Sequence, residues 1–432
     1  GDHRDLHSFP TRRSSDLGRT FRVKKLSIWR VLLPAGIGTS LSLFGDSSLY
    51  TVLPTHTAIA GVSVASVGIL LSANRFIRLL LNSPAGMAYD RLPRRPLFVS
   101  ALFIGACSTA IYALTQGFWP LLVGRLLWGL AWAGIWVGGN TIVLDIANNE
   151  NRGRLVGIYQ LTFFLGASGG AMLGGVLTDL LGFHQNMVIS AAITLLGAFI
   201  ALIFLPETRH LKQDPVKPIR SFKKSEIAST SSEKTETFSI TALFSVNRFV
   251  MAGVLMATLG IFLQEQLGEN IQIAGRTIGI TTLTGLGLGL STLIAMLSAP
   301  LLGEISDHVR NRWRVVAGGL VPGVVGFSLM ALGLPLSILI GIPMIATTSG
   351  SNQGLSTALS GDLGNGKNQS SRLGALFTFG DLASAVGPPL AYAMMPMVGI
   401  KALYLASAGL FALMFLISSQ RGAGTILKPA QI

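Results

Sequence analysis

Long apolar runs fill most of the chain, and short polar segments separate them. A helix crosses the ~30 Å hydrocarbon layer of a membrane with about 20 residues, because it rises ~1.5 Å per residue. The apolar runs reach that length repeatedly. They predict an all-α membrane protein with twelve transmembrane helices, at residues 28–53, 61–86, 97–115, 120–145, 154–180, 186–205, 246–267, 277–303, 314–333, 335–358, 372–396 and 399–419.

Polar features of the first half of the chain recur in the second half at a constant distance. The loop from Gly86 to Pro96 returns in weaker form from Gly303 to Arg312, 217 positions later. A shared offset indicates an internal duplication, which is typical of secondary transporters. We therefore expect two pseudo-symmetric six-helix bundles. The same offset relates three further pairs, Asp145 to Asp362, Gly157 to Gly374 and Gly170 to Gly387.

Composition separates the bundles from their connections. Residues 207–243 are rich in Ser, Thr, Lys and Glu and lack apolar periodicity, which predicts a flexible linker with room for a surface helix. Residues 1–17 resemble a translated sequencing adapter, so we interpret them as an assembly artefact and exclude them from the fold. The expected domains are an amino-terminal bundle at 18–206, a linker at 207–243, a carboxy-terminal bundle at 244–420 and a tail at 421–432.

The charged residues support a membrane location. They make up only 12% of the chain, about half the share of a soluble protein. The net charge of +14 does not indicate a nucleic-acid partner, because almost all Lys and Arg lie in loops on one side of the predicted helices. That side is then cytoplasmic, which places both termini in the cytoplasm and the protein in the cell membrane. The single cysteine, Cys107, excludes an internal disulfide and a cysteine-based metal site.

Several motifs resemble the major facilitator superfamily. The segment Gly86-Met-Ala-Tyr-Asp90-Arg91-Leu-Pro-Arg94-Arg95-Pro96 is similar to the G-x-x-x-D-R-x-G-R-R loop between the second and third helices of that family, with Pro93 where glycine is usual. Arg125-Leu-Leu-Trp128-Gly129 resembles the family's R-x-x-x-G motif. Pro206-Glu-Thr-Arg209 also resembles it. The resemblance extends from about Leu26 to Ser419 and implies the major facilitator fold, with transport by alternating access.

The resemblance implies a gate between the bundles. Asp90 is expected beside the amino end of the helix that starts near Arg372, where an acid meets the positive end of the helix dipole. Asp307 is expected to do the same at the start of helix 154–180, and Arg94 or Arg95 to pair with Asp145. The alternative is a basic loop that only sets topology. The predicted gate residues are Arg78, Gly86, Asp90, Arg91, Arg94, Arg95, Asp145, Gly303, Asp307, Asp362 and Asp381.

A glycine pattern in helix 154–180 resembles the antiporter motif G-x8-G-x3-G-P-x-x-G-G, with Ala171 in place of proline. The proline occurs instead in the second half, as Gly387-Pro388. The resemblance implies one of the 12-helix drug or metabolite:proton antiporters. The alternative is a generic packing face of small residues. The glycines concerned are Gly157, Gly166, Gly170, Gly174 and Gly175.

Charged residues inside the predicted helices are candidates for function, because a charge in hydrocarbon is costly. Asp46 shares one polar stripe with Thr39, Ser42 and Tyr50, and we interpret it as the carboxylate that carries the coupling proton. Arg125 is predicted at the depth closest to that of Asp46, and is its expected partner. The alternative is a permanent salt bridge that only holds the helix in place.

Two further charged residues, Arg78 and Asp381, fall at matching depths on helices 61–86 and 372–396. These helices face each other in the major facilitator fold, so we expect a salt bridge that breaks and re-forms as the bundles move. In a competing interpretation Arg75 and Arg78 line the cavity and bind an anionic substrate. Candidates for the substrate cavity are Arg75, Trp132, Trp136, Asn352 and Gln353. Ordinary packing is the alternative for the last four.

The sequence as a whole predicts a secondary transporter that exports a small organic molecule, a drug or metabolite, in exchange for protons. The alternatives are an uptake symporter and a non-transporting membrane receptor or scaffold. An enzyme is not expected, because the predicted helices hold almost no histidine and no glycine-rich phosphate loop. We expect no cofactor and no metal. The expected partners are a small-molecule substrate, protons and the lipid bilayer, for a protein that acts as a monomer.

Overall fold

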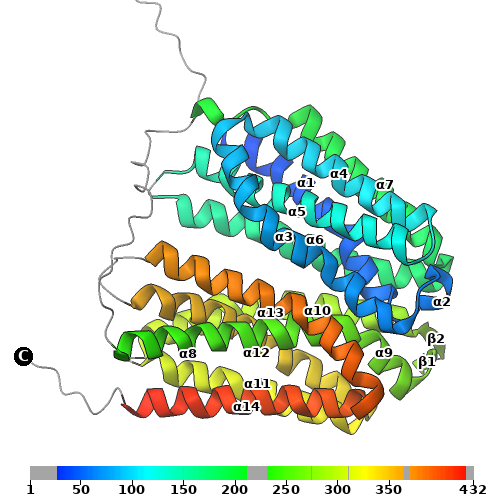
Figure 1. Ribbon diagram of the computed structural model, residues 1–432, viewed down its shortest axis with the longest axis vertical. Coiled ribbons are helices and arrows are strands. Elements are labelled where there is room, and N and C mark those ends of the chain that lie inside the picture. The colour runs from blue at the N-terminus through cyan, green and yellow to red at the C-terminus, as the bar shows by residue number, and fades with distance from the viewer. Residues whose placement is uncertain are drawn as a thin grey trace, which may run out of the picture.

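The computed structural model describes residues 27–148, 150–211, 231–273, 275–309, 311–363 and 369–424. Helices dominate these residues (Figure 1). The first half comprises α1 (Ile28–Val52), α2 (Thr57–Ala60), α3 (Val64–Arg91), α4 (Arg94–Leu114), α5 (Phe118–Ile146), α6 (Arg152–Leu181), α7 (Phe183–Phe204) and η1 (Arg209–Leu211). The second half comprises α8 (Ser231–Arg248), the π-helix η2 (Phe249–Leu255), α9 (Met256–Leu267), β1 (Asn270–Ile273), β2 (Arg276–Gly279), α10 (Ile280–His308), α11 (Arg312–Leu332), α12 (Pro335–Asp362), α13 (Gln369–Val398) and α14 (Ile400–Gly424).

The predicted all-α membrane architecture is confirmed. Among the described residues, ten helical stretches are long and apolar enough to cross a membrane, and one of them joins α8, η2 and α9. The helices α12 and α13 are not among these ten, but they contain 28 and 30 residues and pack among them. With these two helices the described residues contain the twelve long helices that the apolar runs predict.

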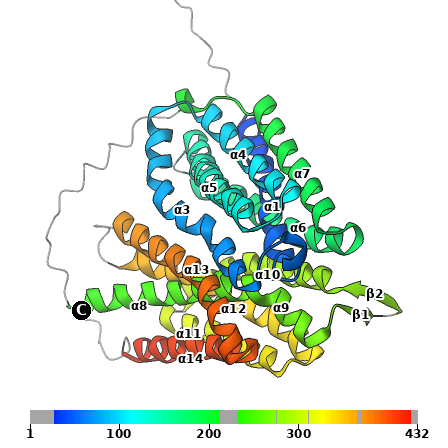
Figure 2. The ribbon, with the colours of Figure 1, turned by 45° about the vertical axis from the view of Figure 1, so that its right-hand side comes forward.

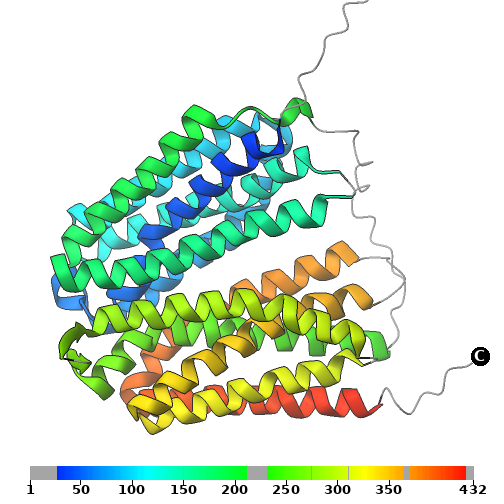
Figure 3. The same ribbon diagram turned by 180° about the vertical axis from the view of Figure 1, so that it is seen from behind.

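The helices form two bundles that lie side by side (Figure 1). Each bundle has its own buried apolar core. Between the bundles α3 packs on α13 and α6 packs on α10, and Figure 3 shows α6 beside α10 from behind. The 217-residue offset maps α6 onto α13, which has the same length of 30 residues, and α3 onto α10. The interface therefore repeats one helix pair twice, as the internal duplication predicts.

The structure differs from the prediction at the start of the second bundle. We expected a linker to residue 243 and a helix from residue 246, but α8 begins at Ser231. Ile240, Leu243 and Phe244 follow helical spacing and lie buried in the core of the second bundle. Their burial makes residues 231–243 part of the bundle, so the predicted linker extends too far. Residues 212–230, and the predicted artefact at 1–17, lie outside the described residues.

A short hairpin replaces the predicted loop between α9 and α10 (Figure 2). Its strands β1 and β2 pair antiparallel, with Ile271 opposite Ile278. Gly275 in the turn has φ of 76°, a conformation that glycine adopts without steric cost. We did not predict the hairpin, because four-residue strands carry little periodicity.

The interface between the bundles is closed at one end and open at the other. A Cβ added at Gly68 would lie 2.7 Å from the carbonyl oxygen of Pro388, and one at Gly175 would clash with the backbone of Thr281. These glycines lie toward the end that carries α2 and the hairpin. At the opposite end Gly86, Gly157, Gly303 and Gly374 have nothing within 4 Å of an added Cβ. The bundles therefore touch through glycines at one end only (Figure 1).

This asymmetry predicts opposite effects for two glycine substitutions. Gly175→Val should prevent closure of the packed end, because its side chain would meet the backbone of α10. Gly157→Val should leave that end closed, since open space surrounds Gly157. The measurement is maleimide labelling of a Thr284→Cys reporter, at a position that is fully buried, in a Cys107→Ser background. Equal labelling of the two valine variants would contradict the assigned asymmetry.

Candidate functional site

The centre of the first bundle contains a fully buried arginine. Arg125 of α5 forms a short ion pair with Asp46 of α1, whose side chain is 15% exposed. Its remaining donors face two carbonyl oxygens of α3, that of Leu70 at 3.0 Å and that of Leu71 at 3.4 Å. A buried charge requires such pairing because it has lost its water. The predicted contact between Asp46 and Arg125 is confirmed, and its role in coupling stays a prediction.

Tyr50 lies between two arginines. The guanidinium carbon of Arg125 lies 5.1 Å from the centre of its ring and that of Arg75 lies 5.2 Å away. Both distances suit a cation–π interaction. The hydroxyl of Tyr50 donates a hydrogen bond of 2.6 Å to the carbonyl oxygen of Leu71, which also faces Arg125. Tyr50 therefore links the buried ion pair to a second arginine.

Arg75 does not line a cavity in this conformation, contrary to our expectation. Its side chain is buried, and Nη1 donates to the carbonyl oxygens of Ala252 at 2.6 Å and Ser384 at 2.5 Å. Ala252 lies in the π-helix η2 and Ser384 lies in α13, so both acceptors belong to the second bundle. Arg75 therefore ties the two bundles together at their interface.

The expected pair of Arg78 and Asp381 is present across the interface. Nη2 of Arg78 lies 2.9 Å from Oδ1 of Asp381. The same oxygen receives Nη2 of Arg248 at 3.5 Å. We missed Arg248 because it falls near the start of the predicted helix 246–267, where charged side chains are common. The earlier start of α8 places it within the bundle instead.

At the open end each bundle contains a similar ion pair. Nε of Arg94 lies 3.1 Å from Oδ2 of Asp145, and the Thr208 hydroxyl donates to the same oxygen at 3.0 Å. In the second bundle Nε of Arg312 lies 2.7 Å from Oδ2 of Asp362, the counterpart of Asp145. The predicted pairing of Arg94 with Asp145 is confirmed. The second bundle contains a similar arginine–aspartate pair, so the duplication is supported by side-chain contacts as well as by sequence motifs.

The gate contacts that we expected from Asp90 and Asp307 to the opposite bundle are absent among the described residues, unlike the pair of Arg78 and Asp381. Asp90 and Arg91 are exposed, and Asp307 pairs with Arg312 of its own bundle at 2.7 Å. Arg95 donates to the carbonyl oxygen of Leu202 within the first bundle. The expected contacts between the bundles do not form at this end because the bundles are apart there. An added Cβ would meet nothing within 4 Å at Gly86, Gly157, Gly303 and Gly374.

Glu207 holds the start of α4. Its carboxylate accepts hydrogen bonds from the backbone N–H groups of Arg94 at 2.9 Å and Arg95 at 3.1 Å, the first two residues of that helix. It also accepts from the N–H groups of Thr208 and Arg209. Burial raises the pKa of Glu207, but the four backbone donors together outweigh burial and hold the pKa below its ordinary value. Glu207 therefore fixes the segment that also positions Arg94.

The motif glycines pack α6 against α1. A Cβ at Gly170 would lie 2.8 Å from Cα of Phe44, and one at Gly174 would clash with Ser48. Gly166 lies against the backbone of Ser40, whereas Gly387 of α13 lies against Gly253 of η2. The glycines form a close packing face, which is the alternative that we considered. Their role in antiport stays a prediction.

Of the four expected cavity residues of α5 and α12, Trp132 and Asn352 are buried and Trp136 is partly exposed. Trp132 is 7% exposed and stacks between Trp128 and Trp136, with ring centres 5.8 and 5.7 Å apart. Asn352 is fully buried, and neither atom of its amide has a hydrogen-bond partner among the described residues. Gln353 is exposed. Trp132 and Asn352 therefore do not line an open cavity here, since the core of each bundle encloses them.

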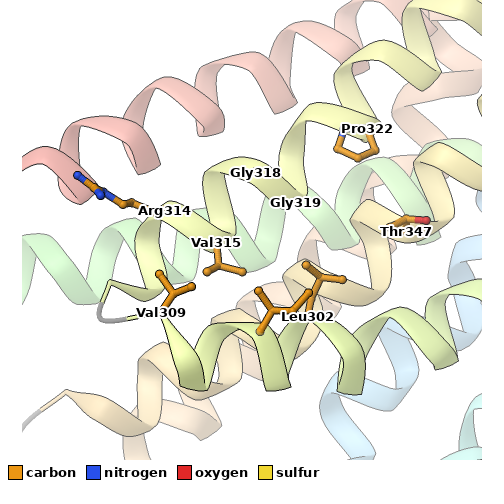
Figure 4. Close-up of a pocket in the computed structure, with 9 residues that line it drawn as sticks. Leu302, Val309, Arg314, Val315, Gly318, Gly319, Pro322 and Thr347 are labelled. Atoms are coloured by element: carbon orange, nitrogen blue, oxygen red, sulfur yellow. The ribbon is translucent and has the colours of Figure 1, made fainter.

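The groove in Figure 4 is lined by no member of these charged pairs. It has a volume of about 380 Å³ and lies between α10, α11 and α12, with apolar walls that include Leu302 and Val315. Arg314 is the charged residue that borders it. Because the groove contains no part of the interface, we assign it no role in transport.

Comparisons with known proteins identify the family. The profile of the Major Facilitator Superfamily matches residues 35–361 and 250–419. The chain belongs to this superfamily. It is therefore a multi-pass membrane protein of a transporter family, as the sequence motifs predict.

Two relatives that align over most of the chain are resistance proteins. The chain is 25% identical to the tetracycline resistance protein, class G, of Vibrio anguillarum over 85% of this chain and 89% of that protein. It is 24% identical to the multidrug resistance protein MdtG of Escherichia coli O17:K52:H18 over 88% of this chain and 91% of that protein. Both alignments span nearly the full transporter.

Solved structures confirm the fold. A bacterial homolog of the human lysosomal transporter Spinster, in its inward-facing and unoccupied conformation, matches with a TM-score of 0.74 at 16% identity. The match covers 93% of this chain and 99% of that one. The human organic anion transporter MFSD10 (TETRAN) matches with a TM-score of 0.61 at 20% identity, over 90% and 99% of the two chains. At these identities the likeness concerns the fold alone.

We expect the effects of substituting Asp46 and Arg125 on the free energy of unfolding to be strongly non-additive. Arg125→Leu should destabilise the protein by about 3–5 kcal/mol, because it leaves a carboxylate in the bundle without its partner. The double variant Asp46→Leu/Arg125→Leu should recover part of that loss. Thermal unfolding in detergent measures both effects, with the exposed Arg91→Gln as control. Losses that simply add in the double variant would contradict the pairing.

The cap at α4 should show a defined pH dependence. The pKa of Glu207 is depressed in the folded protein, so its stabilising effect is complete above the unfolded-state pKa of about 4.3 and is lost as the pH falls further. The Tm difference between wild type and Glu207→Gln should therefore stay nearly constant from pH 7 to about pH 5 and shrink as the pH falls below about 4. Glu150→Gln, at an exposed position, is the matched control. A difference that grows on acidification would contradict this assignment.

Proposed function

We propose that the protein exports a small organic molecule, a drug or metabolite, in exchange for protons. Its relatives over most of the chain are named for tetracycline and multidrug resistance, and the glycine pattern of α6 resembles the antiporter motif. The observation that carries the proposal is the ion pair between Asp46 and Arg125.

The ion pair has the properties that proton coupling requires. Arg125 is fully buried and remains charged, so it needs a compensating negative charge. Asp46 is 15% exposed and is the member of the pair that can accept a proton. A proton on Asp46 neutralises the carboxylate and leaves Arg125 with carbonyl oxygens only. The free energy of that change is available to shift the balance between the two bundle arrangements.

The conformation described above is one of the two that alternating access requires. The Lys and Arg distribution assigns the open end to the cytoplasm, so this is the inward-open arrangement, with both termini on the same side. At the closed end Asp179 of α6 accepts the N–H of Thr282 at 2.7 Å and the Thr281 hydroxyl, at the amino end of α10. In the outward-open arrangement these contacts break, and Asp90 and Asp307 meet the helix ends that are free here.

The test is proton flux in everted membrane vesicles that have been energised to an acidic interior. Addition of transported compounds from a panel of organic cations and anions should dissipate the gradient in wild type and leave it intact in Asp46→Asn. Asp46→Glu, which keeps the carboxylate, should retain part of the flux. Dissipation that survives Asp46→Asn would remove Asp46 as the coupling residue. No dissipation by any compound would overturn proton antiport and favour uptake symport.

A further inference from the structure

A cluster of two arginines and one carboxylate lies at the interface between α3 and α13. Arg78 of α3 and Arg248, at the end of α8, both point to Oδ1 of Asp381, at 2.9 and 3.5 Å. The side chains are 16%, 28% and 22% exposed for Arg78, Arg248 and Asp381. Both bundles contribute to the cluster, and all three members are accessible from outside the protein. A solute between the bundles can therefore reach them.

The cluster carries one positive charge in excess. Asp381 balances one of the two arginines, and the structure shows no other carboxylate paired with either of them among the described residues. The ion pair of Arg125 with Asp46 is balanced, whereas Arg75 is bonded to two neutral carbonyl oxygens and adds its own positive charge near the cluster. An unbalanced charge at membrane depth is unfavourable unless an anion joins it. The excess positive charge thus favours an anionic ligand.

Neighbouring groups extend the cluster into a site for an amphipathic anion. Oδ1 of Asn82, one turn after Arg78, and Oγ of Ser245, one turn before Arg248, are both buried and have no hydrogen-bond partner among the described residues. Phe377, one turn before Asp381 on α13, is 48% exposed. Its ring contacts that of Phe244, with centres 5.6 Å apart. The site therefore combines two cations, two unpaired polar atoms and an exposed aromatic surface.

We propose that this cluster binds the transported molecule, and that this molecule is an organic monoanion with a carboxylate or sulfonate beside an apolar or aromatic part. Arg78 and Arg248 hold the anionic group, as guanidinium groups pair well with planar oxyanions. The aromatic surface of Phe377 contacts the apolar part. Asp381 is an internal competitor for the arginines rather than a ligand for the substrate. The proposal rests on the transport function proposed above.

This role of Asp381 predicts an effect that a purely structural salt bridge would not produce. Asp381→Asn removes the competing carboxylate, so it should tighten anion binding about tenfold while slowing transport, because the bridge between the bundles is weakened. Arg78→Gln and Arg248→Gln should each weaken binding about tenfold or more, since each removes a charged hydrogen bond. Arg78→Lys, which keeps the charge, should lose less. Arg276→Gln, an exposed arginine of the hairpin, should bind as wild type.

The experiment measures equilibrium binding of radiolabelled naphthalene-1-sulfonate to the full-length protein in detergent. The naphthalene-1-trimethylammonium cation, which has a similar ring and the opposite charge, serves as competitor. Saturable sulfonate binding that the cation does not displace, with the variant order above, is the expected result. Each variant is first checked for a monodisperse elution profile. For a variant that does not fold, the lysine replacement at the same arginine gives the answer.

Three results would overturn the proposal: no saturable sulfonate binding, binding of the cation in its place, or weaker binding in a folded Asp381→Asn. Proton flux driven by organic cations, with no sulfonate binding, would refute the anion site and leave proton antiport intact. Sulfonate binding without any proton flux would support the anion site and refute proton antiport. The two proposals therefore fail through different measurements.

Discussion

The cost of placing a charge in hydrocarbon determines much of this structure. Four arginines lie inside the bundles or at their interface, and each one has acceptors on other helices. Arg125 is bonded to α1 and α3, whereas Arg75 of α3 is bonded to the second bundle. Because removing the partner of a buried charge costs several kcal/mol of stability, about 3–5, these contacts fix which helices stay together. They also identify which contacts must change when the bundles move.

The interface between the bundles depends on close backbone contact at one end. Glycines let α3 approach α13 and let α6 approach α10, and Asp179 caps the amino end of α10. The other end has glycines at equivalent positions, but they face open space. Each end thus has small residues and an acid near a helix end. A rocking motion then exchanges one set of contacts for the other without repacking either core.

The sequence predicts those features that depend on local pattern or on the duplication. Apolar run length gives the spans, the 217-residue offset gives the two bundles, and the family motif gives the pair of Arg94 with Asp145. The partner of Arg75 could not be predicted, because backbone carbonyl oxygens leave no signal in the sequence. Arg248 was missed because burial of α8 extends the helix into a polar segment.

The gate residues show a different limit. Asp90 and Asp307 carry a recognisable motif, but whether they contact the opposite bundle depends on which conformation is populated. A sequence encodes both conformations at once, whereas a structure describes one of them. An exposed Asp90 is therefore compatible with a gate that is closed in the other state.

In the proposed transport cycle the two charged clusters have different roles. Asp46 and Arg125 lie within the first bundle and form a balanced pair, so protonation there changes the net charge of the bundle core. Arg78, Arg248 and Asp381 connect the two bundles and carry an excess charge, so a bound anion there changes the interface. Tyr50 joins the clusters, since its ring contacts Arg125 and also Arg75, whose other partners lie in η2 and α13. A proton bound at Asp46 changes the electrostatic field at Tyr50 and Arg75. Because Arg75 is bonded to the second bundle, this electrostatic change acts on the interface between the bundles.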